Sequence, residues 1–144
     1  MNRDSFYRSV AEALSGCQLV EQELKLYISE ALELTRHYVA GRFPFKLSGV
    51  DYHDASLERL IETFKKLNDN DVLLSNLKKF KIERNFLSHQ GIARCLDFEG
   101  ELIDAKVEKY AVQLDLMQTE ASRLQLLIFS EAVNIKRHDL GSQP

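Results

Sequence analysis

Four polar side chains near the middle of the chain have the types needed for acid–base chemistry on a phosphate group. They are Arg84, Asn85, Ser88 and His89. A histidine can take up or release a proton near neutral pH, and an arginine offsets negative charge on a phosphate. Cleavage of RNA without a metal ion uses this combination, because the 2′-hydroxyl must lose a proton while charge develops on the phosphate.

Arg84 interrupts the apolar stripe of a helix that the periodicity predicts over residues 72–90, before a stop at Gly91. The stripe is Leu73, Leu77, Phe80, Arg84 and Leu87, with a second edge at Ile82, Phe86 and His89. An unpaired buried charge costs several kcal/mol, so Arg84 must face a carboxylate, a cleft or another subunit. His89 lies about 140° further around the helix, so the two side chains do not converge within one copy.

A symmetric dimer would resolve this geometry, because two copies of the helix at a two-fold axis place both arginines and both histidines in one cleft. The surrounding charge favours an anionic substrate. Lys78, Lys79, Lys81 and Arg84 stand against Glu83 alone in residues 76–89. We therefore predict that Arg84, His89 and Asn85 are catalytic and that Lys78, Lys79 and Lys81 contact RNA, although a solvated helix face would carry the same lysines.

The elements that must hold these residues are four helices. Stripes of apolar residues at steps of three and four predict long helices over residues 6–38 and 104–135, and a shorter one over 57–67 in addition to 72–90. We predict an all-α, antiparallel four-helix bundle with two long and two shorter helices, and a possible small hairpin near 92–104. Residues 1–138 form one domain, and 139–144 a frayed tail. Gly16 is a possible break in the first helix.

The composition narrows the class of protein. The 144 residues are 44% apolar and 28% charged, with a net charge of −3. Cys17 and Cys95 form no Cys-x-x-Cys pair, which favours a reducing compartment. The chain contains no apolar run of membrane-spanning length and no signal-like start, so we predict a cytoplasmic protein without a membrane partner. Glycine-rich nucleotide loops and histidine spacings for metal binding are absent, so we predict no cofactor and no metal.

Two smaller polar pairs have ordinary explanations. His53 and Asp54 are neighbours in a loop, and adjacent side chains point apart. Glu21 and Lys25 are four residues apart on the first helix, in the favourable order for a surface ion pair.

The run Arg84-Asn85-Phe86-Leu87-Ser88-His89 resembles the motif of the HEPN superfamily (higher eukaryotes and prokaryotes nucleotide-binding), in which four to six residues separate an arginine from a histidine. Asn85 matches the polar residue that typically follows the arginine. The resemblance implies a homodimeric, metal-independent endoribonuclease, as found among toxins and abortive-infection proteins. A subclass paired with nucleotidyltransferase antitoxins has a tyrosine two residues after the histidine, where this chain has Gly91.

Two functions therefore stay open. The first is a ribonuclease that cuts single-stranded RNA in a toxin or anti-phage defence system, restrained by an antitoxin or regulatory protein. The second is a non-catalytic HEPN-like module of the immunity, antitoxin or nucleotide- or RNA-binding type, in which Arg84 is a structural arginine paired within the bundle and His89 is a helix-end histidine.

Overall fold

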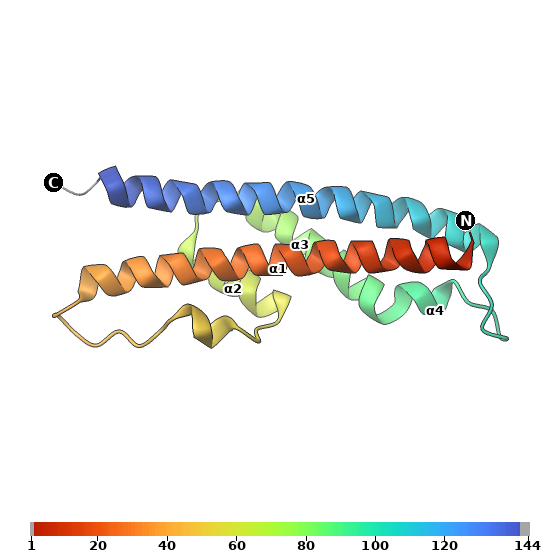
Figure 1. The fold of residues 1–144 in the computed structure, drawn as a ribbon, viewed down its shortest axis with the longest axis horizontal. Helices are drawn as coiled ribbons and strands as arrows, with labels where there is room; N and C mark the ends of the chain where they lie inside the picture. The colour runs from red at the N-terminus through yellow and green to blue at the C-terminus, as the bar shows by residue number, and fades with distance from the viewer. Residues whose placement is uncertain (1, 142–144) are drawn as a thin grey trace.

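The computed structural model describes the backbone of residues 2–141 and the side chains of residues 2–137. It confirms the all-α prediction, with two long helices packed together and two shorter ones against them (Figure 1). The elements are α1 (Arg3–Val39), the short 3₁₀ turn η1 (Gly49–Tyr52), α2 (Leu57–Leu67), α3 (Asp71–Phe86), the π turn η2 (Leu87–Gly91), the single turn α4 (Ile92–Arg94) and α5 (Asp104–Gly141). No helix in the described part of the chain is long and apolar enough to cross a membrane.

The two long helices run in the same direction, and α3 runs opposite to both (Figure 1). Phe6 contacts Tyr110 near the start of α1 and α5, and Glu30 pairs with Lys136 near their ends. The bundle is therefore antiparallel with respect to α3, but not between α1 and α5. The long connection between α1 and α2 permits parallel packing of α1 and α5. A crossover connection of this kind means that successive helices need not alternate in direction.

Helix α1 is one uninterrupted helix of 37 residues. The Asn2 side chain caps it by accepting a hydrogen bond from the Ser5 amide at 2.8 Å, so the helix begins three residues earlier than predicted. Gly16 does not break it. A Cβ on Gly16 would lie 3.1 Å from the Ala121 Cβ, so this glycine lets α1 and α5 approach closely.

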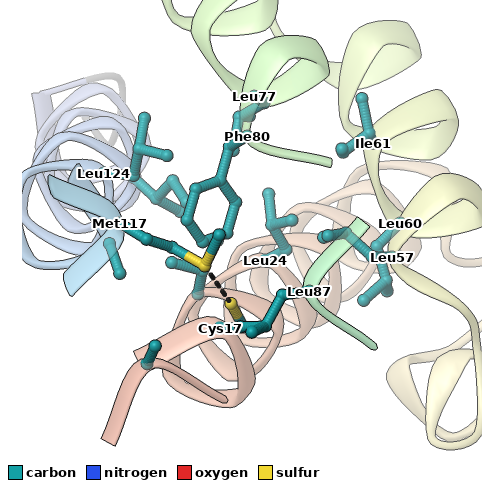
Figure 2. Close-up of a cluster of buried hydrophobic side chains, with 14 of the residues drawn as sticks. Cys17, Leu24, Leu57, Leu60, Ile61, Leu77, Phe80, Leu87, Met117 and Leu124 are labelled. Carbon is teal, nitrogen blue, oxygen red and sulfur yellow. Dashed lines mark hydrogen bonds between the residues drawn. The ribbon is translucent and has the colours of Figure 1, made fainter. Parts of the chain in front are cut away.

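The predicted apolar stripes of α1 and α5 form the core. The stripe of α5 is buried at Val107, Tyr110, Leu114, Met117, Ala121, Leu124 and Ile128. The stripe of α1 is buried at Val10, Ala13, Cys17, Val20, Leu24, Tyr27 and Ala31. Figure 2 shows α1, α3 and α5 meeting around Phe80, Leu124 and Met117. Of the second edge predicted for α3, however, only Phe86 packs against the core. Ile82 is 66% exposed and His89 is also exposed, because α3 packs on its neighbours through a narrower stripe.

The segment after α3 also differs from the prediction. The described residues contain no strand, and the hairpin near 92–104 is reduced to a single antiparallel bridge between Leu96 and Leu102. An isolated two-stranded hairpin is marginal in water, and here the Asp97 carboxylate closes the turn by accepting bonds from the Glu99 and Glu101 amides. Helix α5 begins at Asp104 and continues through Gly141, so residues 139–141 of the predicted tail are helical and 142–144 lie outside the described residues.

A polar junction joins the turn between α2 and α3 to α5. The Glu131 carboxylate accepts hydrogen bonds from the Asn68 side chain at 3.1 Å and the Asn70 side chain at 2.7 Å. Asn68 also donates to the Tyr27 hydroxyl, and Asn70 caps α3 by accepting from the Leu73 amide. This explains why a glutamate interrupts the apolar pattern of α5 at this position.

Replacing Glu131 with alanine should lower the free energy of unfolding by about 1–2 kcal/mol, because two amide donors lose a charged acceptor in a half-buried position. Urea unfolding followed by circular dichroism measures the change. Glu33→Ala is the matched control, since it removes only an exposed ion pair with Arg36 and should cost well under about 1 kcal/mol. Equal losses in the two variants would contradict the role of the junction.

Candidate functional site

Arg84 lies on α3 and faces α1, where its guanidinium forms an ion pair with Glu21 at 3.4 Å. The Arg84 side chain is 31% exposed and the Glu21 side chain 16%. The Arg84 Nε atom is buried without a hydrogen-bond partner. The carboxylate that the sequence required for this arginine is therefore supplied by the same chain, and Glu21 pairs with Arg84 rather than with Lys25.

The apolar core begins directly beside this ion pair. Cys17, one helical turn before Glu21, is buried and its thiol contacts the Met117 sulfur at 3.9 Å (Figure 2). Burial raises the pKa of the Cys17 thiol from 9.0 to about 11, although the positive charge of Arg84 opposes the shift. Cys17 is thus a neutral core residue at physiological pH.

His89 lies on a π turn rather than at the end of an α-helix. The turn Leu87–Gly91 follows α3 directly and leads into α4, so the predicted stop at Gly91 is wrong. Leu87 and Gly91 are buried, whereas Ser88, His89 and Gln90 are exposed. A π turn inserts an extra residue into a helix and is frequent at functional sites. Here it presents three successive polar side chains to solvent.

Gly91 is required by the packing of Tyr110 on α5, and this explains a glycine within a helical segment. A Cβ on Gly91 would collide with the Tyr110 hydroxyl and lie only 2.5 Å from its Cζ atom. The Gly91 backbone is helical, with φ of −57°, so the residue serves close approach and does not end a helix. The Tyr110 hydroxyl is buried without a hydrogen-bond partner, and burial raises the pKa of Tyr110 to about 12.

The predicted catalytic residues are neighbours along one helical segment but do not converge within one chain. Arg84 faces α1, whereas Asn85 and His89 are exposed to solvent. Among the described residues, no hydrogen bond or ion pair joins Arg84 to His89. The Arg84 and His89 side chains therefore do not converge within one copy, as their angular separation along the helix predicted.

The three lysines predicted to contact RNA divide into two groups. Lys78 and Lys79 are exposed on α3. Lys81 is only 25% exposed and pairs with Glu58 of α2 at 3.6 Å, so its charge is partly compensated within the chain. Glu83 and Glu120 lie close enough to interact, and desolvation, followed by the charge of Glu120, raises the pKa of Glu83. The basic surface of α3 is therefore narrower than the sequence indicates.

The sequence analysis predicted neither the pairing of Glu21 with Arg84 nor the π turn. Glu21 does carry a signal, because it directly follows the buried Val20 and so borders the core seam of α1. A carboxylate at such a position is suited to meet a cation on a neighbouring helix. The π turn has no comparable signal in the sequence. Gly91, two residues after His89, is also what the end of an α-helix would show.

Comparisons with known proteins found no matching protein-family model, no matching curated protein and no matching solved structure. The described residues also contain no group of three or more histidine, cysteine, aspartate or glutamate side chains placed to hold a metal ion.

Proposed function

We propose that the protein is a HEPN-like endoribonuclease that acts as a homodimer and cuts single-stranded RNA in a toxin or anti-phage defence system. One observation supports this proposal best. Asn85 at the end of α3 and His89 on the π turn are both exposed, and they follow Arg84, which the ion pair with Glu21 holds in a defined position. A flexible surface arginine would have no such fixed orientation, and fixed orientation of charged groups is what electrostatic stabilisation of a transition state requires.

In the proposed reaction, one histidine removes the proton from a ribose 2′-hydroxyl, and the 2′-oxygen attacks the adjacent phosphorus. The bond from phosphorus to the 5′-oxygen breaks, which leaves a cyclic phosphate and a 5′-hydroxyl end. The histidine of the second copy, or a water, supplies the proton to the leaving oxygen. The two arginines offset the charge that builds up on the phosphate oxygens. Because Arg84 and His89 do not meet within one chain, both copies contribute to each site.

The test is cleavage of a labelled single-stranded RNA by the purified protein in the presence of EDTA. We expect cleavage by the wild type and a loss of about 100-fold or more in Arg84→Ala and in His89→Ala. His53→Ala changes an exposed loop histidine and should cut at the wild-type rate. Absence of cleavage by the wild type, or undiminished cleavage by both variants, would refute the ribonuclease assignment.

One observation favours the second function, a non-catalytic HEPN-like interaction module of the immunity, antitoxin or nucleotide- or RNA-binding type. The charge of Arg84 is already compensated by Glu21, which is the arrangement of an arginine that stabilises the bundle. Under this function, Arg84→Ala lowers the stability of the protein, whereas His89→Ala does not change it. Neither the wild type nor the variants cleave the labelled RNA. The same assay therefore separates the two functions.

A further inference from the structure

A pocket of about 630 Å³ lies where the chain passes from α3 through α4 toward the start of α5. Its walls come from both segments, with Phe86, Gly91 and Arg94 on one side and Lys106, Lys109 and Tyr110 on the other. None of the residues assigned above to RNA cleavage lines it. The volume falls in the range typical of small-molecule sites in proteins.

The pocket is positively charged. Arg94, Lys106 and Lys109 line it, and none of its lining residues has a carboxylate. Within the described part of the chain, none of these three cations forms an ion pair. The Arg94 guanidinium lies 5.2 Å from the centre of the Phe86 ring and donates a 3.0 Å hydrogen bond to Gln90. Three cations without an ion-pair partner in one pocket favour an anion of more than one charge.

A second, independent observation concerns Tyr110, which is 93% buried in the pocket wall. Its hydroxyl has no hydrogen-bond partner and lies against Gly91, which lines the same pocket. Burying a hydroxyl without a hydrogen-bond partner is unfavourable, so such a group in a native protein calls for an explanation, and a bound water or ion is one of them.

The pocket continues into an apolar groove between α3 and α5. This groove has a volume of about 520 Å³ and shares Phe86, Tyr110 and Gln113 with the charged pocket. Glu83 and the exposed Ile82 and Leu116 also line the groove. A ligand that fills both spaces therefore has an anionic end and an apolar, flat body that can lie along Phe86.

We propose that this pocket binds a small phosphate monoester with a flat apolar body. The phosphate contacts Arg94, Lys106 and Lys109, and the apolar body packs on Phe86 toward the groove. A phosphate monoester carries a charge of about −1.5 to −2 at neutral pH, which suits three cations better than a single carboxylate does. The inference is independent of ribonuclease activity, because it uses none of the proposed catalytic residues.

Isothermal titration with phenyl phosphate tests the proposal. We expect saturable binding at one site per chain, with inorganic phosphate and benzyl alcohol each at least about tenfold weaker. The double variant Lys106→Gln/Lys109→Gln should lose about tenfold or more in affinity. Lys46→Gln/Lys65→Gln, which changes two exposed lysines away from the pocket, should bind like the wild type.

The proposal is overturned by the absence of saturable binding to phenyl phosphate, or by equal affinity in the Lys106/Lys109 double variant. Two sources carry the same chemistry, a free ester and the terminal phosphate of a nucleic-acid strand. Competition with a short RNA that bears a 5′-phosphate, beside the same RNA with a 5′-hydroxyl, distinguishes them. Displacement by the phosphorylated strand alone supports a strand end as the ligand, and displacement by neither supports a free ester.

Discussion

Gly91→Ala should destabilise the protein by about 2–3 kcal/mol, although alanine normally stabilises a helical position relative to glycine. The added methyl group would overlap the Tyr110 hydroxyl and approach its ring at 2.5 Å. Tyr110 cannot easily move away, because it is buried and contacts the rings of Phe6 and Phe86. The cost of this overpacking exceeds the gain of about 1 kcal/mol in helix propensity. Urea unfolding at equilibrium measures the difference.

Gly16→Ala is the matched control on α1. Its added methyl group would lie 3.1 Å from the Ala121 Cβ, which requires only a small adjustment. The gain in helix propensity offsets much of that cost, so the change should stay within about 1 kcal/mol of the wild type. If Gly91→Ala is as stable as Gly16→Ala, the Tyr110 ring is not packed directly against Gly91 of the π turn.

The sequence predicted the long helices well because their cores depend on one repeated local pattern. Positions such as Val20 and Leu24 on α1 and Leu114 and Leu124 on α5 recur at helical spacing, and each is fully buried. The direction of the helices was not contained in that pattern. A stripe of apolar residues looks the same whether its partner runs parallel or antiparallel, and only the path of the connections decides between the two.

In the candidate site, too, local features could be predicted from the sequence and tertiary contacts could not. Arg84 stood out because a charge on an apolar stripe needs a partner, and this need is a local property. The identity of the partner is not local, since Glu21 lies on another helix. Gly91 was misinterpreted for a similar reason. Glycine after a helical stretch usually marks a stop, and only the tertiary contact with Tyr110 shows that the chain remains helical there.

Glu21→Ala should lower RNA cleavage by about 100-fold while costing only about 1 kcal/mol of stability, if the protein is the ribonuclease proposed above. Glu21 is the ion-pair partner of Arg84, so its loss frees the guanidinium to move away from the position it now holds. Small displacements of a catalytic group are enough for a rate loss of this size. The stability cost is modest because Arg84 is 31% exposed and water can solvate its charge.

Glu33→Ala is the control, because it breaks an ion pair to Arg36, also on α1, without touching Arg84 or the lysines of α3. It should preserve both cleavage and stability, since Glu33 is 70% exposed. The double variant Glu21→Ala/Arg84→Ala adds a second criterion. If Glu21 acts only by orienting Arg84, the double variant should cut no more slowly than Arg84→Ala alone, because groups that act as a unit are not additive. Faster cleavage in Glu21→Ala than in the wild type would contradict this role, because it would mean that the ion pair restrains Arg84 rather than positions it.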